Sequence, residues 1–487
     1  MSKSTDTLVK NSLPIPTDTR RTHSSRQWFL EAKEDAHAPV FHNNTLSCFI
    51  CGEEAFRHIA ASIRRAKTSI EIVCWGFDPA MELTREQSSQ WPRGETWASL
   101  LHGAAVGQWT QGKPVHVRIL SWFDAIGEMA VANMPGYVNA STSPLDVARL
   151  QRLKALLEPV RTPAALSSSV SVSEKRQRRG EANHLWYTLV KSGQLESLSL
   201  RVRNGDTPAI QRLLSAQSME LSLAERLGME RLGTYHQKTI LIDYDDTSET
   251  ARPKGYVMGL NSVTDYWDTR AHLHTDSRRG EGWEGCLPDA STNLKPYQDY
   301  ACCIEGEALV MLSKNFTEAW NKATGPKGKG ADLLRGHDPN APPAHLTRHL
   351  TGSRKSAQIV RTQPERDGGE NSIERLYHQI ARSARHYLYV ENQYFQHAGW
   401  VSHLKRQRKA YVAMHRKAGS RQADIPNLHL MVVTPTPERP AMVPRTHDAI
   451  KELGFGSSMP RQSEKPRSSA TRKTRRGMSR HGAATTP

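Results

Sequence analysis

The sequence predicts an α/β protein made of two related halves, of which the second is incomplete. Amphipathic helices alternate with apolar strands over residues 53–75 and again over residues 96–120. The same order of helix, strand, helix and strand returns later in the chain, where Ile373 stands about 317 positions after Phe56. We therefore expect sheets covered by helices in a duplicated arrangement with pseudo-twofold halves.

The first half begins with a predicted helix at residues 53–66, whose apolar side chains recur on one face. A strand follows at residues 70–75. A second helix over residues 96–107 leads to a second strand at residues 115–120. Residues 161–183 are Ser-rich and then basic, which is typical of an inserted solvated loop, with a phosphate-contacting patch as the alternative.

The stretch from Leu232 to Asp243 carries the clearest chemical signal. It predicts a short strand that presents His236 and Lys238 on the same side, because side chains two positions apart on a strand point the same way. An imidazole beside an ammonium suits attack on a phosphate diester, since the ring can take the phosphoryl group while the cation stabilises its oxygens. The alternative is a buried His and a surface Lys that flank an apolar strand.

Four elements carry a resemblance to a known family. They are His-x-Lys-x4-Asp over residues 236–243, Gly-x-Asn ending at Asn261, Pro-x-x-Asp ending at Asp299, and the segment Glu-Asn-Gln at residues 391–393. In this order they resemble the phospholipase D superfamily, and most closely the bacterial phospholipase D effectors delivered by type VI secretion. The resemblance implies the superfamily's α/β/α sandwich for the fold predicted above.

The resemblance also implies roles for residues. His236 would be the catalytic nucleophile, Lys238 and Asn261 would bind the phosphate, and Asp299 would orient the His ring. Asp243 belongs to the catalytic signature, and we expect it to form structural hydrogen bonds near the strand end.

Asn392 and Gln393 would lie on the substrate side of the site. No metal or other cofactor is expected, because Lys and His supply the positive charge, and no metal-ligand cluster stands out in the sequence.

A second His-x-Lys-x4-Asp is missing from the chain. His403 and Lys405 have the right spacing, but position 410 is Ala. After Pro460 the chain has no Val, Ile, Leu or aromatic residue, and we interpret this change as a truncation or frameshift that removed the second catalytic half. Loss of a general acid or base slows such reactions by roughly 10²–10⁴-fold, so we expect reduced activity.

Five segments are predicted. They are a flexible leader (1–41), the first half with the catalytic motif (42–322), a linker (323–355), a partial second half (356–460) and a basic disordered tail (461–487).

The net charge and the cysteine content limit the classes of partner and site that we expect. The formal charge is +17, but the tail alone holds eight Lys or Arg against one Glu, so nucleic acid is less expected than a phospholipid membrane surface. The six cysteines form no disulfide framework, and Cys48-x-x-Cys51 is at most a redox or metal half-site.

The amino-terminal residues lack an apolar signal region, and no run of 18 apolar residues occurs. We expect a cytoplasmic protein in the producing cell. The resemblance adds a non-Sec route into target cells.

The function expected from these observations is hydrolysis of a glycerophospholipid to phosphatidic acid and a free headgroup, through a phosphohistidine, in an antibacterial or host-directed effector. A secretion-apparatus or immunity protein would then be a partner. Two alternatives stay open, a phosphodiesterase acting on nucleic acid and an inactive remnant that binds lipid or a partner. The oligomeric state has no signal in the sequence.

Overall fold

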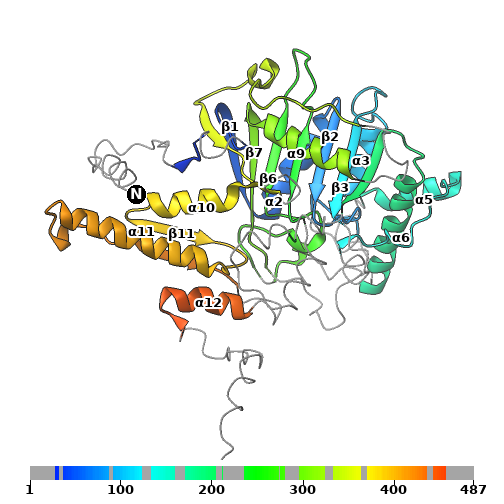
Figure 1. The fold of residues 1–487 in the computed structure, drawn as a ribbon. Helices are drawn as coiled ribbons and strands as arrows, with labels where there is room; N and C mark the ends of the chain where they lie inside the picture. The colour runs from blue at the N-terminus through cyan, green and yellow to red at the C-terminus, as the bar shows by residue number, and fades with distance from the viewer. Residues whose placement is uncertain are drawn as a thin grey trace, which may run out of the picture. The chain divides into compact units, whose positions relative to one another are not determined.

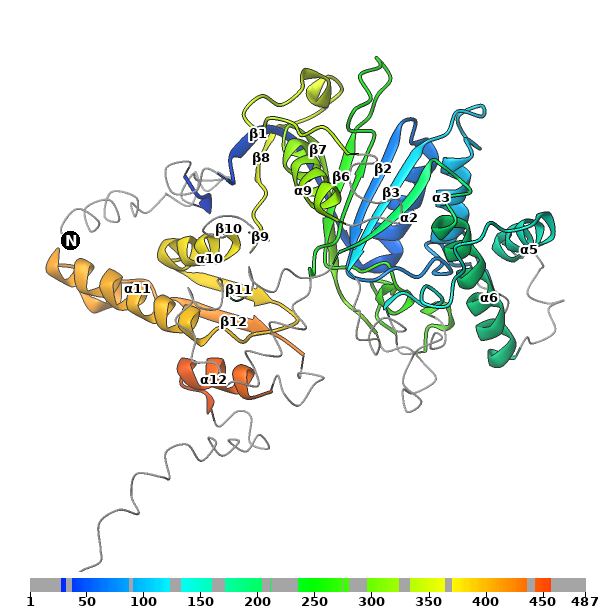
Figure 2. The ribbon, with the colours of Figure 1, turned by 45° about the vertical axis from the view of Figure 1, so that its right-hand side comes forward.

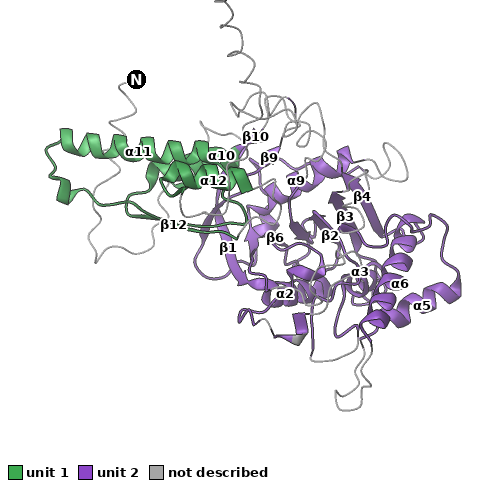
Figure 3. Cartoon of the chain, turned by 90° about the horizontal axis from the view of Figure 1, so that it is seen from below, with its two compact units in different colours: residues 1–30, 372–487 green, residues 31–371 purple. Residues whose placement is uncertain are grey.

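The computed structural model describes the chain in two compact units, one formed by residues 31–371 and the other by residues 372–487 with 1–30 (Figure 3). The described residues are 28–31, 37–86, 91–122, 133–159, 171–203, 211, 235–273, 275–279, 296–323, 333–363, 370–435 and 443–456. The predicted basic tail and most of the predicted leader lie outside them. Within the described residues, no helix has both the length and the apolar character needed to cross a bilayer.

The larger unit is built on an eight-stranded mixed sheet with strand order β4-β3-β2-β5-β6-β7-β1-β8 (Figure 1). The strands are β1 (Val40–Ile50), β2 (Ser69–Cys74), β3 (His116–Trp122), β4 (Leu198–Arg203), β5 (Thr239–Ile242), β6 (Lys254–Met258), β7 (Tyr300–Gly306) and β8 (Lys355–Gln358). β2, β3 and β4 are parallel, whereas β5 is antiparallel to β2 and every later neighbour in the order is antiparallel.

Helices cover both faces of this sheet, as Figures 1 and 2 show. They are α2 (Cys51–Arg65), α3 (Trp97–Ala105), α5 (Val147–Leu157), α6 (Val172–Lys191) and α9 (Leu309–Lys322). Alternation along β5 explains the two layers, because Ile240 and Ile242 enter the core beneath α2 and α3, while Leu241 enters the core beneath α9. The predicted α/β/α arrangement is confirmed.

Three local expectations differ from the structure. The loop predicted over residues 161–183 is helical from Val172 onwards, since Ser171 caps α6 through the backbone N–H of Glu174 and the apolar stretch after residue 181 anchors the helix. β1 replaces irregular chain around residues 40–50. The β5 strand begins at Thr239, so His236 and Lys238 precede it.

The smaller unit repeats the opening of the larger one. Its elements are α10 (Ser372–Ser383), β11 (Tyr387–Glu391), α11 (Ala398–Lys417), β12 (His429–Val433) and α12 (Val443–Leu453). β11 and β12 pair in parallel, as β2 and β3 do. One face of this two-stranded sheet packs on the helices through Leu388, Val390, Leu430 and Val432. The predicted recurrence is therefore present in the fold.

The end of the larger unit runs past the predicted linker. β8 starts at Lys355 and pairs with β1, and a hairpin of β9 (Thr362–Gln363) and β10 (Glu370–Asn371) follows. Residues 356–371, which open the predicted second half, thus contribute to the larger unit.

Candidate active site

His236 and Lys238 lie side by side just before β5. The Nζ atom of Lys238 is 3.0 Å from Nε2 of His236. The backbone carbonyl of Lys238 accepts a hydrogen bond from Met258 N–H at 3.2 Å, so this segment continues the ladder between β5 and β6. The extended backbone explains why two side chains two positions apart meet, as the sequence predicts.

Strand order brings the other predicted residues to the same edge of the sheet. Because β5, β6 and β7 are successive antiparallel neighbours, the start of β5, the end of β6 and the start of β7 lie together. Lys238 precedes β5, Asn261 follows β6 and Asp299 precedes β7. β2 is antiparallel to β5, so its end, with Trp75, reaches this edge too.

The His236 ring packs edge-on against Trp75, with 5.4 Å between ring centroids, and Trp75 stacks on Trp122. The residue keeps exposed surface on its other side. Partial burial of the ring, and then the Lys238 charge, lower the pKa of His236 to about 4. The imidazole is therefore neutral at physiological pH, which a nucleophile requires.

Lys238 is only 4% exposed. Burial lowers the pKa of Lys238 to about 8, against the opposing effect of the Asp299 carboxylate. The side chain thus remains mainly an ammonium at pH 7. Since an ammonium can only donate, Nε2 of His236 must carry the lone pair in this contact.

Asn261 is fully buried beside Gly76. Its Oδ1 atom accepts the backbone N–H of Gly76 at 3.2 Å. Its Nδ2 atom is buried and finds no acceptor among the described residues, and the same holds for Nε1 of Trp75. Buried donors without acceptors are rare in native proteins, so an anionic ligand at this edge is a natural acceptor for them.

Asp299 is held by its backbone and by a close glycine. Its carbonyl accepts Cys51 N–H at 2.8 Å, and its Oδ1 atom accepts Tyr300 N–H at 2.8 Å. A side-chain carbon at Gly259 would lie 1.9 Å from that oxygen. The carboxylate therefore occupies space that only glycine leaves free, and its charge acts on Lys238.

Asp243 does not join these residues. It lies at the other end of β5, five residues from Lys238, which is about 16 Å along an extended chain. Its carboxylate accepts the backbone N–H groups of Lys67, Thr68 and Ser69 at 2.8–3.2 Å. This is the structural hydrogen bonding expected for Asp243, and the geometry gives it no place among the catalytic residues.

Asn392 and Gln393 belong to the smaller unit. Both are exposed at the end of β11, where Asn392 N–H donates to the Val433 carbonyl. They occupy the place in the repeat that Trp75 and Gly76 occupy after β2. Their predicted role on the substrate side remains a prediction.

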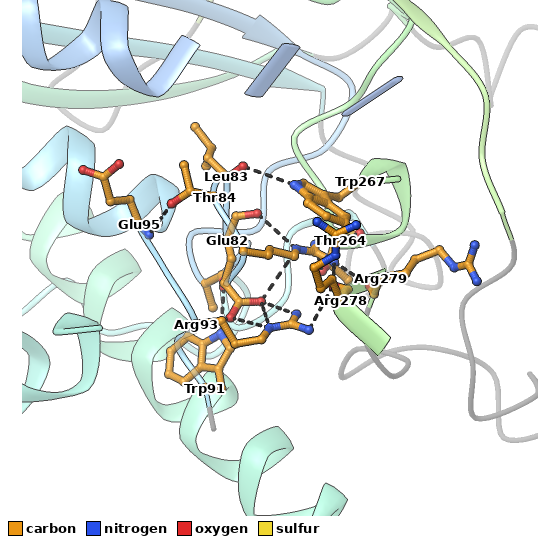
Figure 4. A network of polar contacts seen from close by, with 12 residues as sticks. Glu82, Leu83, Thr84, Trp91, Arg93, Glu95, Thr264, Trp267, Arg278 and Arg279 are labelled. Carbon is orange, nitrogen blue, oxygen red and sulfur yellow. Dashed lines mark hydrogen bonds and ion pairs between the residues drawn. The ribbon is translucent and has the colours of Figure 1, made fainter. Parts of the chain in front are cut away.

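A buried ionic network is formed around Glu82 and Arg85 (Figure 4). The Glu82 carboxylate accepts from the backbone and guanidinium of Arg93. Arg85, fully buried, donates to the carbonyls of Arg278, Arg279 and Thr264. These contacts tie the loop after β2 to the segment after Asn261. Burial alone would raise the pKa of Glu82, but the Arg93 charge outweighs it and lowers that pKa to about 2.

Asp268 connects this network to Asp299. Its Oδ2 atom accepts Tyr297 N–H at 2.8 Å and contacts Nδ1 of His272 at 3.0 Å. The Nη1 atom of Arg279 is 3.5 Å from Oδ1 of Asp268. Asp268 thus fixes the segment that carries Asp299. Sequence reasoning missed Asp268 and Glu82, because no local pattern shows that distant loops will share a buried carboxylate.

The two cysteines of Cys48-x-x-Cys51 face different partners. Cys48 stands opposite Cys302 in the register of β1 and β7, whereas the Cys51 thiol is 3.5 Å from Nε2 of His272. Burial raises the pKa of Cys51 to about 11. This thiol therefore stays protonated, and the described geometry does not make the pair a redox or metal half-site.

Comparisons with known proteins agree with the motif. The family described as "Phospholipase D" matches residues 215–417. Phospholipase D gamma 3 of Arabidopsis thaliana is 25% identical over 36% of this chain and 25% of its own length. Phospholipase D alpha 2 of Oryza sativa subsp. japonica is 26% identical over 33% of this chain and 24% of its own length.

The chain thus spans about a quarter of the length of the curated relatives that it matches. The solved structure of a phospholipase D family member, Nuc from Salmonella typhimurium, aligns with 58% of this chain and with 97% of the Nuc chain. The sequence identity is 11% and the TM-score is 0.24, so no conclusion rests on this likeness.

Proposed function

We propose that this chain is a phosphodiesterase of the phospholipase D superfamily, as its similarity to phospholipases D supports, and that it cleaves glycerophospholipids to phosphatidic acid and a free headgroup alcohol. The observation that carries the proposal is the 3.0 Å contact between Lys238 Nζ and His236 Nε2, at the edge where Asn261 and Asp299 also lie. Lipid as the substrate is supported by the relatives, which are phospholipases D, and His236 as the nucleophile is supported by the geometry of the site.

In the first step Nε2 of His236 attacks phosphorus. A P–N bond forms, the P–O bond to the headgroup breaks, and the headgroup oxygen leaves with the electron pair and takes up a proton. The low pKa of His236 keeps the lone pair available, and the phosphate oxygens replace that nitrogen as the acceptor for Lys238. Nδ2 of Asn261, which is without an acceptor among the described residues, donates to a second oxygen.

In the second step water attacks phosphorus, the P–N bond breaks, and His236 is released as phosphatidic acid forms. Water gives up a proton in this step, and general acid–base catalysis contributes roughly 10²–10⁴-fold to proton transfers of this kind.

The test compares headgroup release from phosphatidylethanolamine vesicles with nicking of plasmid DNA, and detects the phosphohistidine by intact-protein mass spectrometry at alkaline pH. We expect a lipid-dependent phosphatidyl adduct on the wild type and none on His236→Ala. His116→Ala is the matched control. His116 is an exposed histidine of the same sheet, at the start of β3, and the site lies at the other end of the strands.

The other readings give distinct results in this test. DNA nicking that requires His236, without lipid turnover, identifies a nuclease and overturns the lipid substrate. A well-folded wild type that neither releases headgroup nor forms the adduct is an inactive binding remnant.

The effector role is a further part of the proposal, supported by resemblance alone. The partners proposed with it are a phospholipid membrane surface and a secretion-apparatus or immunity protein. Binding of the His236→Ala variant to lipid vesicles, measured by co-sedimentation, tests the membrane partner without the reaction.

A further inference from the structure

Three metal-ligating side chains meet in the smaller unit, between α10 and α11. Glu374 and His378 are four residues apart on α10 and so lie on one helix face, and His397 stands at the N-cap of α11. One ligand atom from each of the three lies within 4.8 Å of the others. The sequence showed no metal cluster here, because β11 separates His397 from the α10 pair and only packing joins them.

We propose that Glu374, His378 and His397 bind one divalent transition-metal ion of the zinc class. This site is independent of the proposed function, since no step of that reaction uses it. Nε2 of His397 is 3.4 Å from Oε1 of Glu374. Two ligands at the usual zinc bond lengths of about 2.0–2.1 Å in a tetrahedral site stand about 3.4 Å apart, so this pair needs little movement.

The donor set selects the class of metal. Two imidazole nitrogens and one carboxylate oxygen suit zinc and its neighbours, whereas calcium and magnesium prefer oxygen ligands alone. Three protein ligands leave a fourth position for water. The partly exposed Glu374 and the half-exposed His397 give an ion access from solvent.

The electrostatic surroundings act in both directions. Arg382 and Arg406 are the cationic neighbours of His378, and they weaken attraction of a dication, while Glu374 strengthens it. The one carboxylate is outnumbered by two guanidinium groups, so charge alone attracts a dication weakly. The site therefore favours a metal that bonds well to imidazole nitrogen.

A third histidine supports the site. The His403 ring stacks on His378 with 4.4 Å between centroids. Its Nε2 atom is buried without a hydrogen-bond partner among the described residues. Stacking restricts rotation of His378, as supporting residues around metal sites do.

Binding requires one local change. Nδ1 of His397 accepts the Trp400 backbone N–H at 3.2 Å, which places the ring proton on Nε2. When Nε2 binds the metal, the ring proton moves to Nδ1, and Nδ1 no longer accepts the Trp400 N–H. Trp400 N–H keeps its bond to the His397 carbonyl at 3.1 Å, so the helix start remains satisfied.

The full chain, stripped of metal with a chelator, is titrated with CoCl₂ and followed by the visible absorption of tetrahedral Co²⁺. We expect one Co²⁺ per chain, displaced by ZnCl₂, and a rise in the unfolding temperature with Zn²⁺. His397→Ala and Glu374→Gln should each weaken binding by at least the roughly 10–100-fold seen when support around a metal is lost. His429→Ala, an exposed histidine of the same unit, is the matched control.

Absence of Co²⁺ bands in the wild type overturns the proposal. Unchanged bands and stoichiometry in His397→Ala and Glu374→Gln also overturn it, because the ion then binds elsewhere. His397 is half-exposed, so its variant should fold normally, and circular dichroism without metal verifies this.

Discussion

Gly259 and Asp299 approach so closely that a methyl group on Gly259 would lie 1.9 Å from the Asp299 carboxylate oxygen. Gly259→Ala should therefore displace Asp299 and reduce formation of the phosphatidyl adduct on His236 by roughly 10²-fold, since about 1 Å of misplacement can have that effect. Gly336→Ala is the control, because no atom lies within 4 Å of the added carbon there. Equal amounts of adduct in both variants would show that the position of Asp299 does not matter.

The pKa of His236, about 4, predicts unusual reactivity in weak acid. Because a neutral imidazole reacts with diethyl pyrocarbonate, His236 should keep its labelling rate at pH 5.5, where an unperturbed histidine in a model peptide loses most of its own. Lys238→Met removes the neighbouring charge and should raise the pKa of His236, so its labelling should fall at that pH. Peptide mass spectrometry follows each histidine. A labelling rate of His236 that falls at pH 5.5 as that of the model peptide does would contradict this prediction.

Glu82 should make the protein sensitive to acid. Its folded pKa of about 2 lies below the ordinary value of 4.5, so its stabilising contribution is present above pH 4.5 and is lost as the pH falls towards 2. A shift of this size corresponds to about 3 kcal/mol. Glu82→Gln should lower the free energy of unfolding by roughly 3–5 kcal/mol at pH 7, because Arg93 and Arg85 lose their buried counter-charge.

Urea unfolding at several pH values measures this effect. Between pH 4.5 and 2, the free energy of unfolding should fall less in the Glu82→Gln variant than in the wild type. Glu181→Gln serves as the control, since Glu181 forms a surface ion pair with Arg152. An equal, small change in both variants would argue against a stabilising role for the buried network.

Asp243 should affect stability without affecting chemistry. Asp243→Ala leaves the N–H groups of Lys67, Thr68 and Ser69 without their acceptor, and the backbone φ of 55° at this position disfavours Ala. We expect a loss of about 3 kcal/mol in urea unfolding, with the pH profile of His236 labelling unchanged. A shifted His236 profile in a variant that remains folded would instead connect Asp243 to the site.

Much of the fold follows from local patterns. The 3.6-residue and two-residue periodicities predicted α2, β2, α3 and β3 of the larger unit, and the repeat in the smaller unit. β1 was missed because its polar residues Asn43 and Asn44 interrupt an apolar pattern. α6 was missed over its first turns because they are exposed and basic, and their helical order comes from the cap and the buried turns that follow.

The sequence by itself determined that His236 and Lys238 would meet, because two residues of separation on an extended chain leaves their side chains on one side. Only the tertiary structure decided that Asn261, Asp299 and Trp75 would join them, since that depends on which strands become neighbours and in which direction. The same holds for the Glu82 network and for the three ligands between α10 and α11. Such contacts join segments far apart in the chain, and they form only when burial of the whole core brings those segments together.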